Sequence, residues 1–139
     1  MKTDKLIIYT DGAARGNPGP AAIGVDIRDE SGNTVAGISR RLGVTTNNQA
    51  EYRAIIAGLE KAISLGARRI IIKSDSELVV KQLNGQYKIK NAALRPLYQE
   101  IVKLFGTLES VSITNIPREQ NSAADALANK ALDSDKNIS

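Results

Sequence analysis

The stretch Leu6-Ile7-Ile8-Tyr9-Thr10-Asp11 indicates what kind of fold this chain adopts. The run is apolar nearly throughout, so it predicts a central β-strand over residues 5–11, buried on both faces. A similar run, Ile70-Ile71-Ile72-Lys73-Ser74-Asp75, predicts another such strand over residues 69–74. Each run ends on an acid, and ligands of open α/β sheets bind at the carboxyl ends of the strands.

Two further strands are predicted between these runs, over residues 21–29 and 34–42. Glu30-Ser31-Gly32-Asn33 supplies turn residues for a hairpin between them. The segment Gly12 to Pro20 is dense in glycine and proline and is therefore predicted to be a loop. Since no partner strand follows Asp11 at once, a simple hairpin turn after the first strand is disfavoured.

Helical patterns fill most of the remaining chain. Thr46 and Gln49 fit a capping box for a helix that ends near Leu65, with Gly66 at its C-terminus. Asp75 or Ser76 is expected to cap a short helix to about Leu83. The other expected elements are a helix over 94–105 with Pro96 in its first turn, a strand over 110–116, a helix over 121–133 and a frayed tail over 134–139. This order predicts one domain over residues 1–139 with one mixed five-stranded sheet and helices packed on it.

Composition excludes several kinds of chemistry. The 139 residues include no cysteine and no histidine, which excludes disulfides, thiolate or histidine metal sites and Ser-His-Asp catalysis. The formal charge of +4 favours polyanionic partners, although ordinary solubility explains it equally well. The sequence shows no signal peptide and no apolar stretch near the ~18 residues of a membrane span, so we expect a soluble, cytoplasmic protein with no membrane contact.

Four acids, Asp11, Glu51, Asp75 and Asp125, fall at element boundaries that could meet at one edge of the sheet. Glu51 lies on the helical stripe that should pack on the sheet, where an ionised carboxylate is costly unless it is paired or bound to metal. Each acid also has an ordinary explanation: a turn for Asp11, a salt bridge for Glu51, a helix cap for Asp75 and a capping box for Asp125. Oxygen-rich clusters suit Mg²⁺ or Mn²⁺, so the chain is predicted to be a metal-dependent enzyme acting on a phosphorylated substrate.

Four separated motifs resemble those of type 1 ribonuclease H, in the same order and at similar spacing over nearly the whole chain. They are Tyr9-Thr10-Asp11-Gly12 with Gly16-Asn17-Pro18-Gly19-Pro20, Thr46-Asn47-Asn48-Gln49-Ala50-Glu51, Ser74-Asp75-Ser76, and Asn121-x-x-Ala124-Asp125-x-Leu127-Ala128. The resemblance implies an α/β fold of the ribonuclease H type. In that fold strands 1–3 are antiparallel, strands 4–5 run parallel to strand 1, and helices cover both faces.

By the same resemblance, the chain would be an endonuclease that hydrolyses the RNA strand of RNA/DNA hybrids. It would use two divalent cations, Mg²⁺ or Mn²⁺, and leave 5′-phosphate and 3′-hydroxyl ends. Asp11 would contact both ions, Asp125 the ion that activates the attacking water, and Glu51 and Asp75 the ion at the departing 3′ oxygen. We expect a monomer that acts on the hybrid, with double-stranded RNA open as a second substrate.

Substrate contacts are also implied. Asn17, Asn47, Asn48 and the backbone of Ala14, Arg15 and Gly16 would contact the 2′-hydroxyl that distinguishes RNA from DNA, and Thr46 would contact a DNA phosphate. Loop and cap chemistry is the alternative for the paired asparagines.

The sequence departs from the family in two places. Arg118 lies where many relatives carry a histidine, and a short connector with Lys88 and Lys90 replaces a long basic protrusion. We expect all three of these basic side chains to contact phosphates of the substrate. A binding module that has lost catalysis is disfavoured because no acid is missing. A nuclease for DNA junctions is disfavoured by the asparagine-rich loops.

Overall fold

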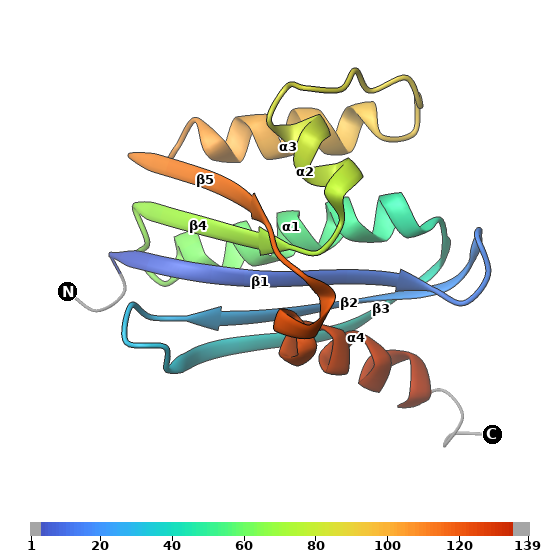
Figure 1. Ribbon diagram of the computed structural model, residues 1–139, viewed down its shortest axis with the longest axis horizontal. Helices are drawn as coiled ribbons and strands as arrows, with labels where there is room; N and C mark the ends of the chain where they lie inside the picture. Colours follow the sequence, from blue (N-terminus) through green and yellow to red (C-terminus); the bar gives the residue numbers. More distant parts are fainter. Residues whose placement is uncertain (1–3, 135–139) are drawn as a thin grey trace.

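One mixed sheet of five strands, in the order β3-β2-β1-β4-β5, organises the molecule (Figure 1). The computed structural model describes residues 4–134, so most of the expected tail, residues 135–139, lies outside the described residues. The strands are β1 (Lys5–Ala14), β2 (Gly19–Arg28), β3 (Thr34–Thr45), β4 (Arg69–Ser74) and β5 (Ser110–Asn115). β1, β2 and β3 are antiparallel, whereas β4 and β5 run parallel to β1, as the resemblance to ribonuclease H implied.

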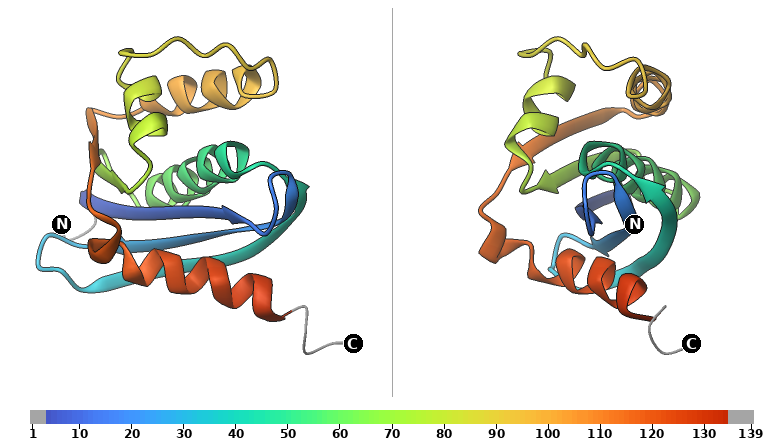
Figure 2. Two further views of the ribbon diagram at one scale, coloured as in Figure 1. Left: turned by 45° about the vertical axis from the view of Figure 1, so that its right-hand side comes forward. Right: turned by 90° about the vertical axis from the view of Figure 1, so that its right-hand side faces the viewer.

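Helices cover both faces of this sheet, which confirms the predicted fold class. The helices are α1 (Asn47–Ser64), α2 (Glu77–Leu83), α3 (Arg95–Phe105) and α4 (Ser122–Ser134), with a 3₁₀ turn η1 (Arg118–Gln120) before α4. Figure 2 shows α4 on one face and α1 on the other, with α3 stacked outside α1. α1 contacts β1 and β2, and α4 contacts β1, β2 and β3. Within residues 4–134, no helix is long and apolar enough to cross a membrane.

The core is aliphatic, as a chain with few aromatic residues requires. Leu6 and Ile8 of β1 are fully buried on the side of α1, where Gly58 of α1 packs against Ile8 and Val25. A smaller cluster under α4 joins Ala22 to Ala131 and Leu132. Burial of this apolar surface holds the two helices against opposite faces of β1 and β2.

The prediction of a long loop after Asp11 was wrong. β1 continues through Gly12 to Ala14, and these residues pair with Ile23, Ala22 and Ala21 of β2. Only residues 15–18 connect the two strands, so β1 and β2 form a hairpin and Asp11 lies within β1 rather than at its end. Ala13 and Ala14 give no hydrophobic alternation, so the sequence pattern could not distinguish this part of the strand from a loop.

Helix caps resolve two alternatives. Ser76, and not Asp75, caps α2, because its hydroxyl accepts the Val79 N–H at 3.4 Å. Thr46 caps α1 by accepting the Gln49 N–H at 3.2 Å, but the Gln49 side chain accepts from Thr45, so the capping box is not closed. Other boundaries differ from the predicted ones by one to three residues: β2 and α4 each extend further in one direction, and β3 runs to Thr45.

Candidate active site

The site lies where the sheet narrows from five strands to three. β4 and β5 stop while β1 continues beside β2, as Figure 1 shows. Thr10 of β1 pairs with Ser74, the last residue of β4. The residues that follow them, Asp11 and Asp75, therefore lie at the same level of the sheet. The polypeptide therefore places two carboxylates side by side, one within β1 and one immediately after the end of β4.

Glu51 joins this pair from the first turns of α1. One carboxylate oxygen from each of Asp11, Glu51 and Asp75 lies within 4.8 Å of the other two. Glu51 is only 7% exposed, and its Oε2 is buried without a hydrogen-bond partner. No basic side chain among residues 4–134 forms an ion pair with it, so the salt-bridge explanation for Glu51 fails.

Asp125 approaches from the opposite face, in the first turn of α4. It lines one cavity of about 450 Å³ together with Asp11, Asp75, Asn47 and Arg118. Its Oδ2 accepts a hydrogen bond from Asn129 Nδ2 at 3.3 Å. Asp125 lies outside the tight group of three oxygens, but its charge acts on Asp11.

Burial and electrostatic repulsion both act on the acids of this cavity. Burial, and then the charges of Asp75 and Asp125, raise the pKa of Asp11 to about 7. Burial and the charge of Asp11 also raise the pKa of Glu51 well above its ordinary value, although the Gly12 N–H that donates to Glu51 acts in the opposite direction. These are the conditions that a divalent cation relieves, and the unpartnered Glu51 oxygen is a ready ligand, so the residues fit hard cations.

Two glycines allow both helices to approach Asp11. A Cβ on Gly12, the next residue in β1, would overlap the backbone of Ala50 and Glu51 in α1. A Cβ on Gly24, opposite Asp11 in β2, would overlap the Ala124 carbonyl in α4. The close contacts bring Glu51 and Asp125 to the same strand residue. Nothing in the sequence pattern singled out Gly24, because close backbone approach leaves no periodic signal.

The predicted RNA-contacting residues form a hydrogen-bonded group beside the acids. Asn47 Oδ1 accepts the Ala14 N–H at 2.9 Å, and Asn17 Oδ1 accepts the Asn47 N–H at 3.0 Å. The connection between β1 and β2, which includes Gly16 at φ 101°, is thereby fixed to the start of α1. Both amide oxygens are used, and the amide NH₂ groups of Asn17 and Asn47 form no hydrogen bond within residues 4–134.

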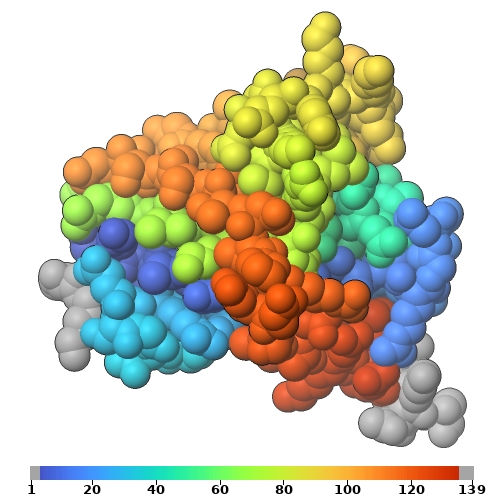
Figure 3. Space-filling model, viewed as in Figure 1, coloured from blue at the N-terminus to red at the C-terminus, as the bar shows by residue number. Residues whose placement is uncertain are grey.

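The other predicted contacts are more dispersed. Arg15 pairs with Asp133 at 2.6 Å, so its side chain lies along the C-terminal end of α4. Thr46 and Asn48 lie at the start of α1, and Thr46 is occupied as the helix cap. Arg118 lies in η1 and faces the acidic cavity. Figure 3 shows the segment around η1 in the middle of one face of the molecule, between α2 and α4.

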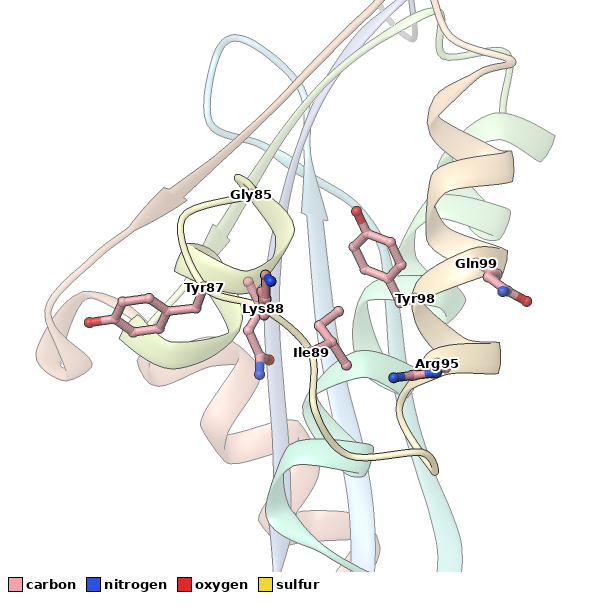
Figure 4. Close-up of a pocket in the computed structure, with 8 residues that line it drawn as sticks. Gly85, Tyr87, Lys88, Ile89, Arg95, Tyr98 and Gln99 are labelled. Atoms are coloured by element: carbon pink, nitrogen blue, oxygen red, sulfur yellow. The ribbon is translucent and has the colours of Figure 1, made fainter.

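Lys88 and Lys90 lie outside the acidic cavity. Both are exposed on the connector between α2 and α3. Lys88 instead lines a second cavity of about 470 Å³ between this connector and α3, with Ile89, Arg95 and Tyr98 (Figure 4). Tyr87 is 49% exposed, and Lys81 lies over its ring. The connector therefore presents a separate basic and aromatic surface.

Comparison with known proteins gives consistent matches. A family model described as "Reverse transcriptase-like" matches residues 9–131. The "Ribonuclease HI" of Halobacterium salinarum is 46% identical over 125 residues, covering 90% of this chain and 63% of that protein. The "Bifunctional protein Rv2228c" of Mycobacterium tuberculosis is 42% identical over 130 residues, covering 93% of this chain and 36% of that protein. The chain thus spans about a third to two thirds of the length of these relatives.

The solved structures agree with the fold described above. A crystal structure of LC11-RNase H1, an enzyme isolated from compost, in complex with an RNA/DNA hybrid is 44% identical and superposes with a TM-score of 0.89. The match covers 96% of this chain and 99% of that one.

Proposed function

Because the chain belongs to the type 1 ribonuclease H family, we propose that it hydrolyses the RNA strand of RNA/DNA hybrids with two divalent cations, Mg²⁺ or Mn²⁺. The products are a 5′-phosphate and a 3′-hydroxyl. The convergence of Asp11, Glu51 and Asp75 around an unpartnered buried oxygen is the observation that carries this proposal. The hybrid bound to LC11-RNase H1 supports the same substrate class.

The four acids would hold the cations. Asp11 shares a tight group of oxygens with Glu51 and Asp75, and the charge of Asp125 also acts on it, which supports our proposal that Asp11 would contact both ions. When bound, two divalent cations stabilise the charges that develop on the attacking and departing oxygens of an in-line phosphoryl displacement. The chain contains no histidine or cysteine that could bind the ions in place of these acids.

The reaction needs no covalent intermediate with the protein. A water oxygen forms a bond to phosphorus, the bond from phosphorus to the ribose 3′ oxygen breaks, the water loses a proton to solvent and the 3′ oxygen gains one. The contribution of the chain is to position the scissile phosphate in the acidic cavity. Arg118 lines that cavity and would place a positive charge beside the phosphate, both before and after cleavage.

Selection of the RNA strand rests on the group formed by Asn17 and Asn47. Their amide NH₂ groups are donors for the 2′-hydroxyl, which DNA lacks. Thr46, at the start of α1, would face the phosphate of the DNA strand, and Lys88 and Lys90 would contact phosphates further along the duplex. All of these residues come from one chain, so we propose a monomer as the active unit. Double-stranded RNA, which also carries 2′-hydroxyls, would be a weaker substrate.

Cleavage of a strand-labelled RNA/DNA duplex tests the proposal. The protein is incubated with the hybrid, RNA/RNA and DNA/DNA in Mg²⁺, in Mn²⁺ or in excess chelator, and product ends are identified by their reactivity to phosphatase and polymerase. We expect cleavage of the RNA strand of the hybrid with metal only, with 3′ ends that a polymerase can extend. Equal cleavage of DNA/DNA, or undiminished cleavage in chelator, would contradict the proposal.

A further inference from the structure

A buried asparagine, Asn121, joins the segments that carry the acidic cavity. It lies between η1 and α4 and is 1% exposed. Its N–H donates to the Arg118 carbonyl at 2.9 Å, which closes η1, and its carbonyl accepts the Asp125 N–H at 3.1 Å, which starts α4. The backbone of this one residue therefore connects the turn that presents Arg118 with the helix that presents Asp125.

The side chain of Asn121 extends the connection to the central strand. Its Nδ2 donates to the carbonyl of Thr10 at 2.9 Å, a bond between residues 111 positions apart. Thr10 immediately precedes Asp11. One side chain thus fixes the start of α4 against the backbone from which Asp11 projects.

Only the amide donor explains this arrangement. The Asn121 Oδ1 is buried without a hydrogen-bond partner, which costs stability. An amide turned the other way would direct its oxygen at the Thr10 oxygen, so the NH₂ group must face β1. An apolar side chain could fill the same space without burying an unsatisfied oxygen. The hydrogen bond that Asn121 donates to Thr10 therefore accounts for an asparagine at this position.

A second asparagine makes a similar bond at the neighbouring strand. Asn115 Nδ2 donates to the carbonyl of Ser74 at 3.1 Å, and Ser74 immediately precedes Asp75. The carbonyl groups before both strand acids are thus bound by asparagine side chains from the segment that leads to α4. Ser74 also accepts the Ile116 N–H at 2.9 Å, and unlike Asn121, Asn115 is exposed.

We propose that Asn121 is a positioning residue that sets the separation of Asp125 from Asp11, and through it the affinity of the cavity for divalent cations. The proposal rests on the proposed function only in taking the acids as cation ligands. Without cations the acids repel one another. The buried hydrogen bond from Asn121 to the Thr10 carbonyl resists their separation. A cation then binds an arrangement that is already in place, and the ordering cost of binding is correspondingly smaller.

Mn²⁺ binding to the protein without nucleic acid tests this proposal. Asn121→Ser keeps a small polar side chain at this position but is too short to reach the Thr10 carbonyl. Asn84→Ser is the matched control, because Asn84 Nδ2 also donates to a strand carbonyl, that of Ile113, at 3.5 Å, and neither residue lines the acidic cavity. Binding is measured by calorimetry, and thermal unfolding in chelator reports stability separately.

We expect Asn121→Ser to weaken Mn²⁺ binding by about tenfold or more, as is typical when a residue that orients metal ligands is replaced. Asn84→Ser should bind within about twofold of the parent, whatever its unfolding temperature. A parent-like affinity in Asn121→Ser, or the absence of Mn²⁺ binding by the parent, would overturn the proposal. If the serine variant does not unfold cooperatively, Asn121→Thr, which fills more of the space, takes its place under the same criteria.

The outcome is separable from that of the proposed function. A parent that binds Mn²⁺ but leaves hybrids intact contradicts ribonuclease activity, while the effect of Asn121→Ser on Mn²⁺ affinity still decides the positioning role. A parent that cleaves hybrids while Asn121→Ser binds Mn²⁺ normally leaves the enzyme assignment in place and removes Asn121 from it.

Discussion

Gly24 of β2 lies directly opposite Asp11 of β1, and the missing side chain of Gly24 is the space into which the backbone of α4 fits. On the other face of the sheet, the missing side chain of Gly12 likewise leaves space for the backbone of α1. Two helices therefore approach the β1–β2 pair closely from opposite sides, each bringing an acid. The grouping of the acids around the cavity therefore depends on these two glycines as well as on the acids themselves.

Gly24→Ala should separate α4 from the sheet. The new Cβ would overlap the Ala124 carbonyl, so α4 and Asp125 must move. We expect a loss of about 1–3 kcal/mol in the free energy of unfolding, together with a large loss of hybrid cleavage. Gly37→Ala is the control, because a Cβ there would meet its nearest neighbours at 3.7 Å. Gly24→Ala with parental activity and stability would show that α4 is not held by this contact.

Removing one charge from the cavity should stabilise the metal-free protein while abolishing its activity. Asp11→Asn eliminates a buried carboxylate that repels Asp75 and Asp125. In chelator at about pH 8 we expect the free energy of unfolding to rise by on the order of 1 kcal/mol or more. Hybrid cleavage should fall to background. Chemical denaturation and single-turnover cleavage measure the two effects, and a variant that cuts as fast as the parent would remove Asp11 from the site.

Stability without metal should fall as pH rises. The pKa of Asp11 is about 7 in the folded protein and 3.8 as its ordinary value, so the folded state binds more protons over that interval. Stability should therefore decrease from about pH 4 to pH 7 and level off above. Cations bind the deprotonated acids, so Mg²⁺ should stabilise the protein more at about pH 8 than at pH 5.

Unfolding midpoints in chelator and in Mg²⁺, measured across this pH range, check the linkage. Asp11→Asn serves as the reference and should show a flatter dependence. A parent protein whose metal-free stability rises steadily with pH would contradict the electrostatic description of the cavity.

The connector lysines should contribute to affinity through phosphate contacts. Replacing both Lys88 and Lys90 with Ala should weaken hybrid binding and reduce the slope of log affinity against log salt by roughly 1–2. Binding is measured with a chelator present, at several salt concentrations. Lys61→Ala, at the far end of α1, should leave the slope unchanged. An unaltered slope in the double variant would place the hybrid away from the connector.

Arg118 should act on product release more than on the cleavage step. It lines the acidic cavity from η1 and would bind the phosphate that cleavage leaves behind. Arg118→Ala should therefore slow multiple-turnover cleavage more than single-turnover cleavage. Rapid-quench experiments at limiting and at excess enzyme distinguish the two, and equal effects on both rates would contradict this role.

Sequence patterns were sufficient for the mixed five-stranded sheet with helices packed on it, because apolar runs and helix caps are local signals. Apolar runs define β1 and β4, and the loops and caps around them indicate which strands are joined through helices. Asp75 illustrates the limit of such reasoning: a carboxylate next to a serine at a helix start fits either a cap or a ligand, and only the hydrogen bond of Ser76 to Val79 separates them.

Contacts between distant backbones were beyond these patterns. The extension of β1 to Ala14 depends on pairing with β2, and the role of Gly24 depends on a helix that lies 100 residues later in the chain. Asn121 is similar, since its partner at Thr10 is 111 residues away. Side chains that act through such long-range backbone contacts have no periodicity that could reveal them.

Carboxylates from β1, α1, the end of β4 and α4 would together hold the divalent cations. Anomalous scattering from crystals soaked in Mn²⁺ locates these ions without reference to activity. We predict ions between Asp11 and the carboxylates of Glu51, Asp75 and Asp125, at oxygen distances of about 2.0–2.6 Å. Crystals that bind Mn²⁺ elsewhere, with these four side chains left without metal, would contradict the account.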